Sequence, residues 1–342
     1  MDSPNRADFL KELKPGGKYA GVIGVYRHND SANFIGVFDP EIISALAETG
    51  VKWIAHNGAG YDQIDVPACR SRGESTVILR FASITFVPGI KVSNTPGAVD
   101  DATATTALYL IISTLRQYSK AERNLRNGVW KSGLNSGRAF DITGKTLAIL
   151  GMGGIGTRIA ELARAFPMRV IYHNRRPAEG APSWAEYYPK ERFAEFLKEA
   201  DVLAVSIPLR PETEGFVGEE MIRGLKKGAI IVNTARGKVI DEDAMIRALE
   251  DGHVCPPAIL FVHLPTCLLH SQLGAVGLDV YPNEPEVNPR LLGFDNVTLL
   301  PHMGTETKDS QKKMELRALG NLKDFLVHGS GKDLVLEMRP RL

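Results

Sequence analysis

Short apolar runs alternate with helical stretches along most of the chain, and this alternation predicts a parallel α/β architecture. The clearest example opens with the apolar run 147–150, which is followed by a glycine-rich turn over 151–156. A helical pattern comes next, and its apolar face carries Ile155, Ile159, Leu162, Ala163 and Phe166. The apolar run 170–172 closes the segment, so we predict one βαβ unit with the glycines at its first turn.

The rest of the chain repeats this pattern in two series. In the first series we predict strands over 19–24, 51–55 and 90–93 and a helix over 40–47. A long helix over 101–127 follows, and we expect its apolar face to be buried between domains or in a dimer; this face holds Ala107, Leu108, Ile111, Ile112 and Leu115. The second series predicts strands near 202–205, 230–232, 275–278 and 297–300 and a helix over 308–326 that returns to the first domain. We therefore expect two doubly wound, Rossmann-like parallel-sheet domains.

Composition narrows the range of functions. The chain has 342 residues, 44% hydrophobic and 24% charged, with a formal net charge of +1, so we expect neither a nucleic-acid partner nor an acidic membrane partner. Its start is polar, and no stretch is long and apolar enough to span a bilayer, so we expect a cytoplasmic protein. The three cysteines, Cys69, Cys255 and Cys267, have no metal-ligand spacing, and we expect no metal site.

The glycines of the βαβ unit predict a dinucleotide site. Gly151 permits a tight turn, Gly153 lets a pyrophosphate approach the backbone, and Gly156 lets the helix and the strand pack closely. The helix N-terminus that follows offers N–H groups and the positive end of a dipole. The alternative is that these are ordinary turn and packing glycines.

Polar residues gather where the predicted strands end, which is where ligands bind in doubly wound sheets. Asn174, Arg236, Asp279 and His302 all lie at or just beyond such ends in the second series. In the first series, the turn over 56–62 is rich in glycine, and its N–H groups could form a concave nest for a carboxylate. A plain loop is the alternative there.

Four motifs make the chain resemble the D-isomer-specific 2-hydroxyacid dehydrogenases, and among them the glyoxylate/hydroxypyruvate reductase branch. They are GMGGIG at 151–156, NTARG at 233–237, GLDVYPNEP at 277–285 and LPHMG at 300–304. The resemblance implies a substrate domain formed by 1–108 and 309–342, an NAD(P)-binding Rossmann domain formed by 109–308, and an active site in the cleft between them. It also implies an oxidoreductase that transfers a hydride from NAD(P)H to a small 2-oxo acid and forms the D-2-hydroxy acid. The family is homodimeric through elements around the first helix of the cofactor domain, and the apolar face at 107–115 together with Trp130 is compatible with such a contact.

The resemblance also assigns roles to single residues. Arg236 would grip the substrate carboxylate and carbonyl, for which its rigid fork of donors is suited. His302 would donate a proton to the carbonyl oxygen, and Glu284 would orient the imidazole and favour its protonated form. Asp279 would bind the nicotinamide carboxamide. The other expected cofactor-binding residues are Gly151, Gly153, Gly154, Ile155, Gly156, Asn174, Arg175, Arg176, Pro208, Thr213 and Thr234. The expected substrate-binding residues are Asn57, Gly58, Ala59 and Gly60.

The end of the second strand of the βαβ unit bears on the choice of cofactor. An NAD site usually has an acidic residue there for the ribose hydroxyls, whereas this chain has Asn174, Arg175 and Arg176. Two guanidinium groups suit a 2′-phosphate, so we expect NADP(H), with NAD(H) as the alternative.

Three stretches depart from the family pattern. Residues 74–88 and 254–272 are interposed where the family has almost nothing, and the second contains no Asp, Glu, Lys or Arg. They are either lineage-specific loops or in-frame introns left in the gene sequence, because both junctions can be encoded with splice-site sequences. The third departure is at the start, where 1–17 lacks the apolar strand that usually opens the substrate domain.

The sequence is also compatible with a function from another class. The same fold, with the same Arg, Glu and His, occurs in dinucleotide-sensing transcriptional corepressors. No additional interaction segment is visible in the sequence, which favours the enzyme.

Overall fold

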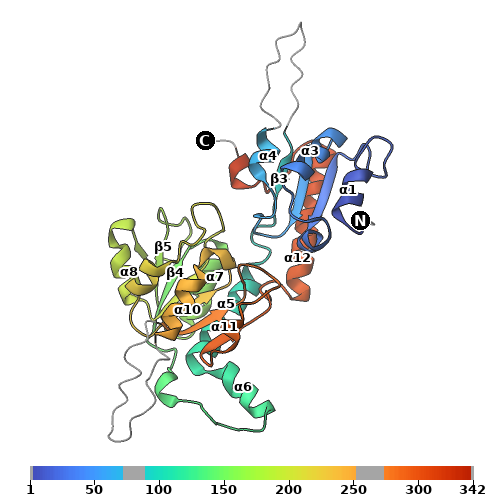
Figure 1. Cartoon of the computed structure of the whole chain (residues 1–342). Coiled ribbons are helices and arrows are strands. Elements are labelled where there is room, and N and C mark those ends of the chain that lie inside the picture. Colours follow the sequence, from blue (N-terminus) through green and yellow to red (C-terminus); the bar gives the residue numbers. More distant parts are fainter. Residues whose placement is uncertain (1–2, 72–88, 252–272, 340–342) are drawn as a thin grey trace, which may run out of the picture. The chain divides into compact units, whose positions relative to one another are not determined.

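The computed structural model describes residues 3–71, 89–251 and 273–339, so the interposed stretches 74–88 and 254–272 lie outside the described residues. The chain forms two compact units (Figure 1). The first unit comprises Met1–Val99 and Thr307–Leu342, and the second comprises Asp100–Glu306.

Within its described residues, the first unit is built on a parallel sheet of three strands in the order β1-β2-β3. The strands are β1 (Gly24–His28), β2 (Trp53–Asn57) and β3 (Lys91–Ser93). The α-helices are α1 (Arg6–Glu12), α2 (Ala32–Ile35), α3 (Pro40–Thr49), α4 (Val66–Ser71) and α12 (Lys308–His328). Short 3-10 turns cover Asn29–Ser31 and Leu336–Met338.

Helices cover both faces of this sheet and bury its central strand. On one face, Ile42 and Leu46 of α3 join Ile54 of β2 in a single hydrophobic core. On the other face, Phe325 of α12 stacks on Trp53 of β2 with ring centroids 5.3 Å apart. Every residue of β2 is buried, so the loop that follows it starts from a fixed point.

The first predicted strand is wrong in position. We expected a strand over 19–24, but β1 begins at Gly24. Gly21 has a φ of +78°, which an extended strand cannot accommodate, and the N–H of Val22 bonds to the carbonyl of Tyr19 in a turn. Where the stretch 1–17 lacked an apolar strand, the structure has α1, whose Phe9 is buried in the same core.

Within its described residues, the second unit contains a parallel sheet of seven strands in the order β10-β9-β8-β7-β4-β5-β6. The strands are β4 (Thr146–Leu150), β5 (Arg169–His173), β6 (Glu186–Tyr188), β7 (Val202–Val205), β8 (Ala229–Asn233), β9 (Leu273–Leu278) and β10 (Val297–Leu299). The α-helices are α5 (Asp100–Arg116), α6 (Tyr118–Arg126), α7 (Gly154–Arg164), α8 (Phe193–Glu199), α9 (Glu219–Gly224), α10 (Glu242–Glu250) and α11 (Pro289–Leu292). Single 3-10 turns cover Ser136–Arg138, Lys190–Arg192 and Gly237–Val239.

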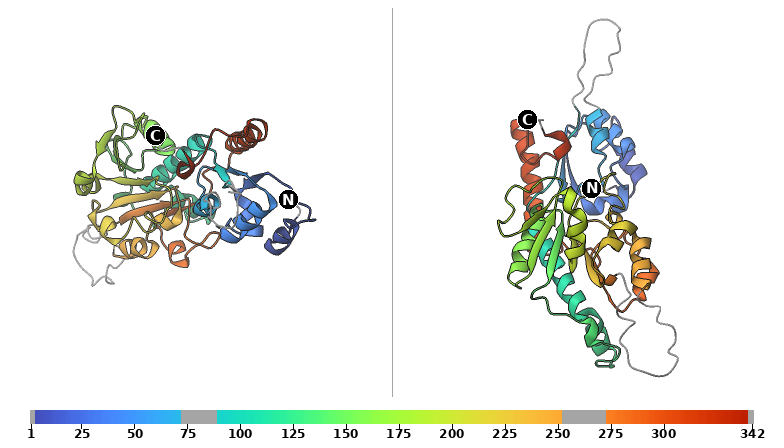
Figure 2. Two further views of the ribbon diagram at one scale, coloured as in Figure 1. Left: turned by 90° about the horizontal axis from the view of Figure 1, so that it is seen from above. Right: turned by 90° about the vertical axis from the view of Figure 1, so that its left-hand side faces the viewer.

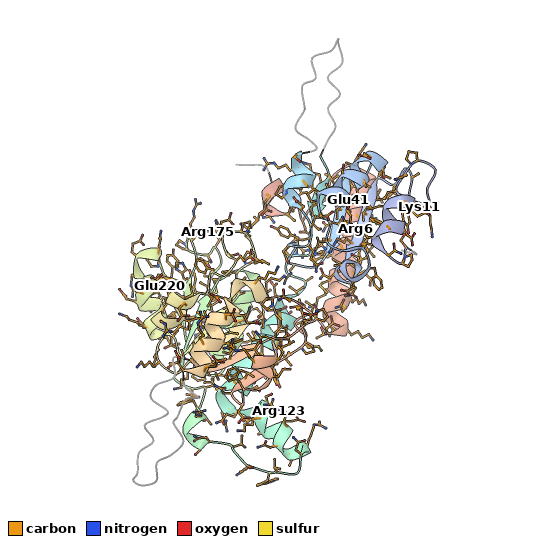
Figure 3. The ribbon with its side chains drawn as sticks, viewed as in Figure 1. Arg6, Lys11, Glu41, Arg123, Arg175 and Glu220 are labelled. Carbon is orange, nitrogen blue, oxygen red and sulfur yellow. The ribbon has the colours of Figure 1, made fainter. Side chains whose placement is uncertain are left out.

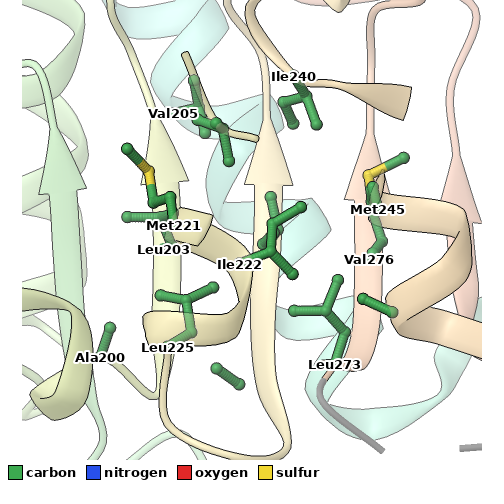
Figure 4. Packing of buried hydrophobic residues seen from close by; sticks show 14 of the residues in the cluster. Ala200, Leu203, Val205, Met221, Ile222, Leu225, Ile240, Met245, Leu273 and Val276 are labelled. Atoms are coloured by element: carbon green, nitrogen blue, oxygen red, sulfur yellow. The ribbon is translucent and has the colours of Figure 1, made fainter. Parts of the chain in front are cut away.

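This sheet is doubly wound, with helices on both of its faces (Figure 2). A hydrophobic core lies on each face. Helices α8, α9 and α10 cover one face, where Leu203 of β7, Ile222 of α9 and Val276 of β9 pack together (Figure 4). Helices α5 and α7 cover the other face. The strand order runs outward in both directions from β4 and β7, and a ligand site is expected where the winding reverses. The predicted α/β class with parallel sheets is confirmed.

The long helix predicted over 101–127 is two helices. The helix is interrupted at Gln117, which takes a left-handed φ of +56°. The side-chain amide of Gln117 donates to the carbonyl of Asn135 at 2.6 Å. The expected apolar face of α5 is not left for a dimer, because Ala107, Ile111 and Leu115 belong to a core of the second unit. The large apolar side chains exposed near α6 are instead Tyr118, Leu125, Val129 and Trp130.

Candidate active site

The glycine turn between β4 and α7 has a shape that side chains would prevent. Gly151 has a φ of +104°, and a Cβ there would lie 2.6 Å from the carbonyl oxygen of Ser206. A Cβ on Gly156 would overlap the carbonyl oxygen of Gly151, and one on Gly154 would overlap the carboxylate of Asp100. A Cβ on Gly153, in contrast, would meet no atom of the described residues within 4 Å. Gly153 therefore borders open space at the N-terminus of α7, where backbone N–H groups attract anions.

A hydrogen bond to Asn174 connects the end of β5 to this glycine turn. Its Oδ1 accepts a hydrogen bond from the backbone N–H of Met152 at 2.7 Å. Arg175 and Arg176 follow it and are exposed, and Figure 3 labels Arg175 at the surface of the second unit. Asn174 thus shapes the turn, a role that the sequence did not indicate, while the two arginines present their charges to solvent.

The turn after β7 adjoins the glycine turn. The N–H of Ser206 donates to the carbonyl of Leu150 at 2.8 Å, which joins the two strand ends. The hydroxyl of Thr213 donates to the carbonyl of Pro208 at 2.7 Å and closes the following loop. Pro208 and Thr213 therefore lie in one loop beside the point where the winding of the sheet reverses.

His302 and Glu284 form a hydrogen-bonded pair in the second unit. Nδ1 of His302 lies 2.7 Å from Oε2 of Glu284, and 43% and 34% of the two side chains are exposed. The bond to Glu284 raises the pKa of His302 above its ordinary value, against the opposing effects of burial and of Arg236. Burial raises the pKa of Glu284, but the hydrogen bonds from His302 and from the N–H of Tyr281 outweigh it and lower that pKa. Both shifts favour an imidazolium beside a carboxylate.

Asp279 shapes the backbone that carries His302. Its side-chain oxygens accept hydrogen bonds from the N–H groups of Met303, at 2.6 Å, and Gly304, at 2.8 Å. Its carbonyl accepts the N–H of His302 at 2.8 Å, and His302 takes a left-handed φ of +56°. Asp279 is 1% exposed, and burial raises the pKa of its carboxyl. It therefore holds the turn that presents the imidazole.

Arg236 lies in a turn after β8 that Asn233 holds in shape. The side-chain amide of Asn233 donates to the carbonyl of Arg236 and accepts the N–H of Ala235, both at 2.9 Å. Arg236 affects the pKa values of both His302 and Glu284 by its charge, so the three groups form one electrostatic cluster. Thr234, which precedes Ala235 in the same turn, is 8% exposed. The sequence motif included Asn233, but its role was missed because it depends on bonds to the backbone.

The expected substrate loop belongs to the first unit. Asn57 is the last residue of β2 and is 2% exposed, and its amide donates to the hydroxyl of Tyr26 at 2.7 Å. Gly58, Ala59 and Gly60 follow it, and the last two are partly exposed. The cluster around Arg236 belongs to the second unit.

Among the residues that the structure describes, no helix combines the length and the apolar character needed to cross a membrane. Among the same residues, no group of three or more His, Cys, Asp or Glu side chains is arranged to hold a metal ion.

Comparison with known proteins identifies the family. The family described as D-isomer specific 2-hydroxyacid dehydrogenase, NAD binding domain, matches residues 108–259. The chain is 40% identical over 338 residues to 4-methyl-2-oxopentanoate reductase A of Aspergillus oryzae, covering 98% of this chain and 90% of that protein. The chain belongs to the D-isomer-specific 2-hydroxyacid dehydrogenases.

Solved structures of glyoxylate reductases agree with the fold. A glyoxylate reductase from Paecilomyes thermophila superimposes with a TM-score of 0.83 at 40% identity and covers 98% of this chain and 90% of its own. An NADPH-dependent glyoxylate/hydroxypyruvate reductase from Sinorhizobium meliloti, solved with NADP and malonate, gives a TM-score of 0.73 at 28% identity, covering 94% of this chain and 86% of its own.

As a D-isomer-specific 2-hydroxyacid dehydrogenase, the protein is an oxidoreductase that uses a nicotinamide dinucleotide to reduce 2-oxo acids. The predicted family, fold class and enzyme class are therefore confirmed. The named relatives are reductases, which favours the enzyme over the corepressor alternative.

Proposed function

We propose that the protein is an NADPH-preferring reductase of small 2-oxo acids of the glyoxylate or hydroxypyruvate type, and that it forms the D-2-hydroxy acid. The observation that carries the proposal is the pair of His302 and Glu284, with Arg236 near enough to affect both pKa values. Relatives named glyoxylate reductase support the choice of substrate.

In this proposal the second unit is the cofactor domain. The open space beside Gly153 fits a pyrophosphate, because a side chain there would fill it. Gly151, Gly154, Ile155 and Gly156 complete the turn and the start of α7. The cofactor is also bound by residues at or after neighbouring strand ends: Pro208, Thr213, Thr234 and Asp279. When bound, the nicotinamide dinucleotide supplies the hydride for the reduction.

The preference for NADP(H) is proposed from the end of β5. Asn174 occupies the position where an acidic residue would favour NAD, and its side chain bonds to the glycine turn instead. Arg175 and Arg176 are exposed and can pair with a 2′-phosphate. The Sinorhizobium meliloti relative solved with NADP supports this choice.

The chain's own residues supply the remaining chemistry. Arg236 binds the substrate through its guanidinium, whose planar donors match a 2-oxo acid. Nε2 of protonated His302 donates a proton to the carbonyl oxygen as that oxygen gains negative charge. Glu284 keeps the imidazole protonated and oriented through Nδ1. The first unit is the substrate domain in this proposal, and its Asn57–Gly60 loop binds the substrate carboxylate.

We further propose that the protein is a cytoplasmic homodimer. The large apolar side chains exposed around α6 support the dimer: Trp130 is 70% exposed, Leu125 60% and Val129 48%. A self-complementary contact between two copies would bury them. Trp130 of the expected contact is kept in this proposal, while Leu125 and Val129 take the place of the apolar face of α5.

Steady-state kinetics with the purified protein tests the proposed activity. The substrates are glyoxylate, hydroxypyruvate and 4-methyl-2-oxopentanoate, each with NADPH and with NADH. We expect rapid NADPH oxidation with the two small acids and a higher kcat/KM for NADPH than for NADH. Tight NADPH binding without turnover of any of the three acids would contradict the proposal, and a preference for NADH would contradict the cofactor choice alone.

A further inference from the structure

Three consecutive carbonyl groups of the loop after β2 accept hydrogen bonds from the first unit. The N–H of Thr95 donates to the carbonyl of Gly58 at 3.0 Å. The side-chain amide of Asn94 donates to the carbonyl of Ala59 at 2.7 Å. Nε2 of His56 lies 2.8 Å from the carbonyl oxygen of Gly60. The acceptor side of the loop is therefore fixed.

These bonds also determine where the N–H groups point. In a planar trans peptide, a carbonyl and the N–H of the next residue point in opposite directions. The bonds to the carbonyls of Gly58 and Ala59 thus direct the N–H groups of Ala59 and Gly60 away from Thr95 and Asn94. In the part of the chain that the structure describes, neither N–H donates a hydrogen bond, and both residues are partly exposed. These two N–H groups are therefore turned to the side of the loop opposite Asn94 and Thr95.

Asn94 is itself anchored to the C-terminal part of the first unit. It is 8% exposed, its N–H donates to the carbonyl of Asp333 at 3.1 Å, and its carbonyl accepts the side-chain amide of Asn321 at 3.2 Å. The carboxylate of Asp333 accepts two hydrogen bonds from Arg317, at 2.8 and 2.9 Å. Asn94 therefore links α12 to the loop.

His56 is held in one tautomer by a buried arginine. The guanidinium of Arg27 lies 3.1 Å from Nδ1 of His56, and both residues are 0% exposed. Because a guanidinium can only donate, Nδ1 accepts, and the imidazole proton is on Nε2. That proton is the one donated to the carbonyl of Gly60. A second bond from Arg27 to the side-chain oxygen of Gln63, at 2.6 Å, fixes the guanidinium.

We propose that Asn94 is a positioning residue for the substrate carboxylate, and that His56 supports it at the next peptide. By holding the carbonyl of Ala59, Asn94 keeps the N–H of Gly60 turned toward the side where a carboxylate binds. Removing the bond lets this peptide rotate and replaces a donor by a carbonyl oxygen, which repels a carboxylate. The inference rests on the proposed assignment of Asn57–Gly60 as the carboxylate-binding loop.

The test compares Asn94→Ala and Asn94→Asp with a matched control, Asn296→Ala. Asn296 also donates its side-chain amide to a carbonyl, that of Gly274 at 2.8 Å, but it precedes β10 at the amino end of the strand. Calorimetric titration with oxalate measures carboxylate binding without turnover. We expect oxalate to bind about tenfold more weakly to Asn94→Ala, more weakly still to Asn94→Asp, and unchanged to the control.

Kinetics of the same variants separate positioning from a structural role. The KM for glyoxylate is expected to rise about tenfold in Asn94→Ala, with the KM for NADPH and kcat unchanged. A fall in kcat with an unchanged KM for glyoxylate would overturn the proposal. Should Asn94→Ala not fold, hydrogen exchange on the unchanged protein decides: oxalate must slow exchange in the peptide covering 56–62, and no slowing would overturn the proposal.

Failure of the inference can be told from failure of the proposed function. If the unchanged protein reduces glyoxylate and the Asn94 variants bind oxalate normally, the positioning role is refuted and the function stands. If the unchanged protein binds oxalate with the expected dependence on Asn94 but reduces no 2-oxo acid, the function is refuted and the positioning role stands. An unchanged protein that binds no oxalate would overturn the inference.

Discussion

Nδ1 of His302 lies 2.7 Å from Oε2 of Glu284, and this bond joins two residues whose pKa values move in opposite directions. The bond raises the pKa of His302, while the pKa of Glu284 is lowered in spite of its burial. Near neutral pH the pair is therefore biased toward imidazolium and carboxylate. A proton donor is then available at Nε2, on the ring edge opposite Glu284.

Replacing Glu284 by Gln should shift the pH profile of reduction. His302 acts in its protonated form, so kcat/KM falls as pH rises through its pKa. Because the bond to the carboxylate raises that pKa, Glu284→Gln lowers it and moves the alkaline limb to lower pH. The measurement is kcat/KM for glyoxylate across pH. Glu286→Gln, an exposed neighbour, serves as control. An unmoved alkaline limb in Glu284→Gln would contradict this role.

Replacing Asp279 by Asn distinguishes its role in holding the turn of His302 from its proposed role in binding the nicotinamide carboxamide. The carboxylate accepts the N–H groups of Met303 and Gly304, so an amide leaves one N–H facing another donor. We expect a loss of about 1–3 kcal/mol in the free energy of unfolding and a fall in kcat of about ten- to a hundredfold, because the turn carrying His302 shifts. Chemical denaturation and steady-state kinetics measure the two effects. A raised KM for NADPH with kcat intact would show that carboxamide binding dominates.

The sequence predicted those features that depend on local pattern. A run of four apolar residues predicts a buried strand at 202–205, and β7 occupies these residues with all four buried. Features that depend on distant contacts were missed. Gln117 is compatible with a helix, and the bonds of its side chain to the backbone of Asn135, which form only in the folded chain, accompany the break there. Strand β6 is a short edge strand with no apolar run, and its pairing with β5 defines it.

The same distinction applies to the candidate site. Arg236, Glu284 and His302 could be proposed from motifs because their chemistry is a property of the side chain. Asn174 and Asn233 act by bonding to backbone groups of neighbouring turns, and these bonds depend on the folded arrangement of strand ends. Sequence spacing carries no signal for such bonds.

Gly153→Ala and Gly156→Ala should fail in different ways. A methyl group on Gly153 meets no described atom within 4 Å, and its φ of −91° is ordinary, so the variant should fold with an unchanged melting temperature. The methyl group would occupy the space proposed for the pyrophosphate and weaken NADPH binding about tenfold or more. In Gly156→Ala the methyl group overlaps the carbonyl of Gly151, which should destabilise the fold by about 1–3 kcal/mol. Scanning calorimetry and NADPH titration distinguish the two. Equal NADPH affinity in Gly153→Ala and the unchanged protein would contradict the proposed pyrophosphate site beside Gly153.

Substitutions at the end of β5 should separate cofactor choice from cofactor binding. Arg175→Ala and Arg176→Ala remove charges proposed to pair with the 2′-phosphate, so the KM for NADPH should rise about tenfold while the KM for NADH stays the same. Asn174→Ala removes the acceptor for the N–H of Met152 and disturbs the glycine turn, so both KM values should rise together. Steady-state kinetics with each cofactor at saturating glyoxylate measures this. Parallel changes for both cofactors in the arginine variants would refute the 2′-phosphate role.

The proposed homodimer predicts a specific response to charge at Trp130. This side chain is 70% exposed, and burying it between two copies would contribute about 2–3 kcal/mol per copy. Trp130→Asp would place a charge in the contact, so we expect a dimer for the unchanged protein and a monomer for the variant in sedimentation velocity. Leu316→Asp on α12 is the matched control, because Leu316 is 61% exposed and lies outside the proposed contact. It should leave the dimer intact. A buried charge disrupts only the interface that contains it. If Leu316→Asp were monomeric and Trp130→Asp dimeric, the dimer contact would therefore lie at α12 and the proposed contact at Trp130 would be wrong.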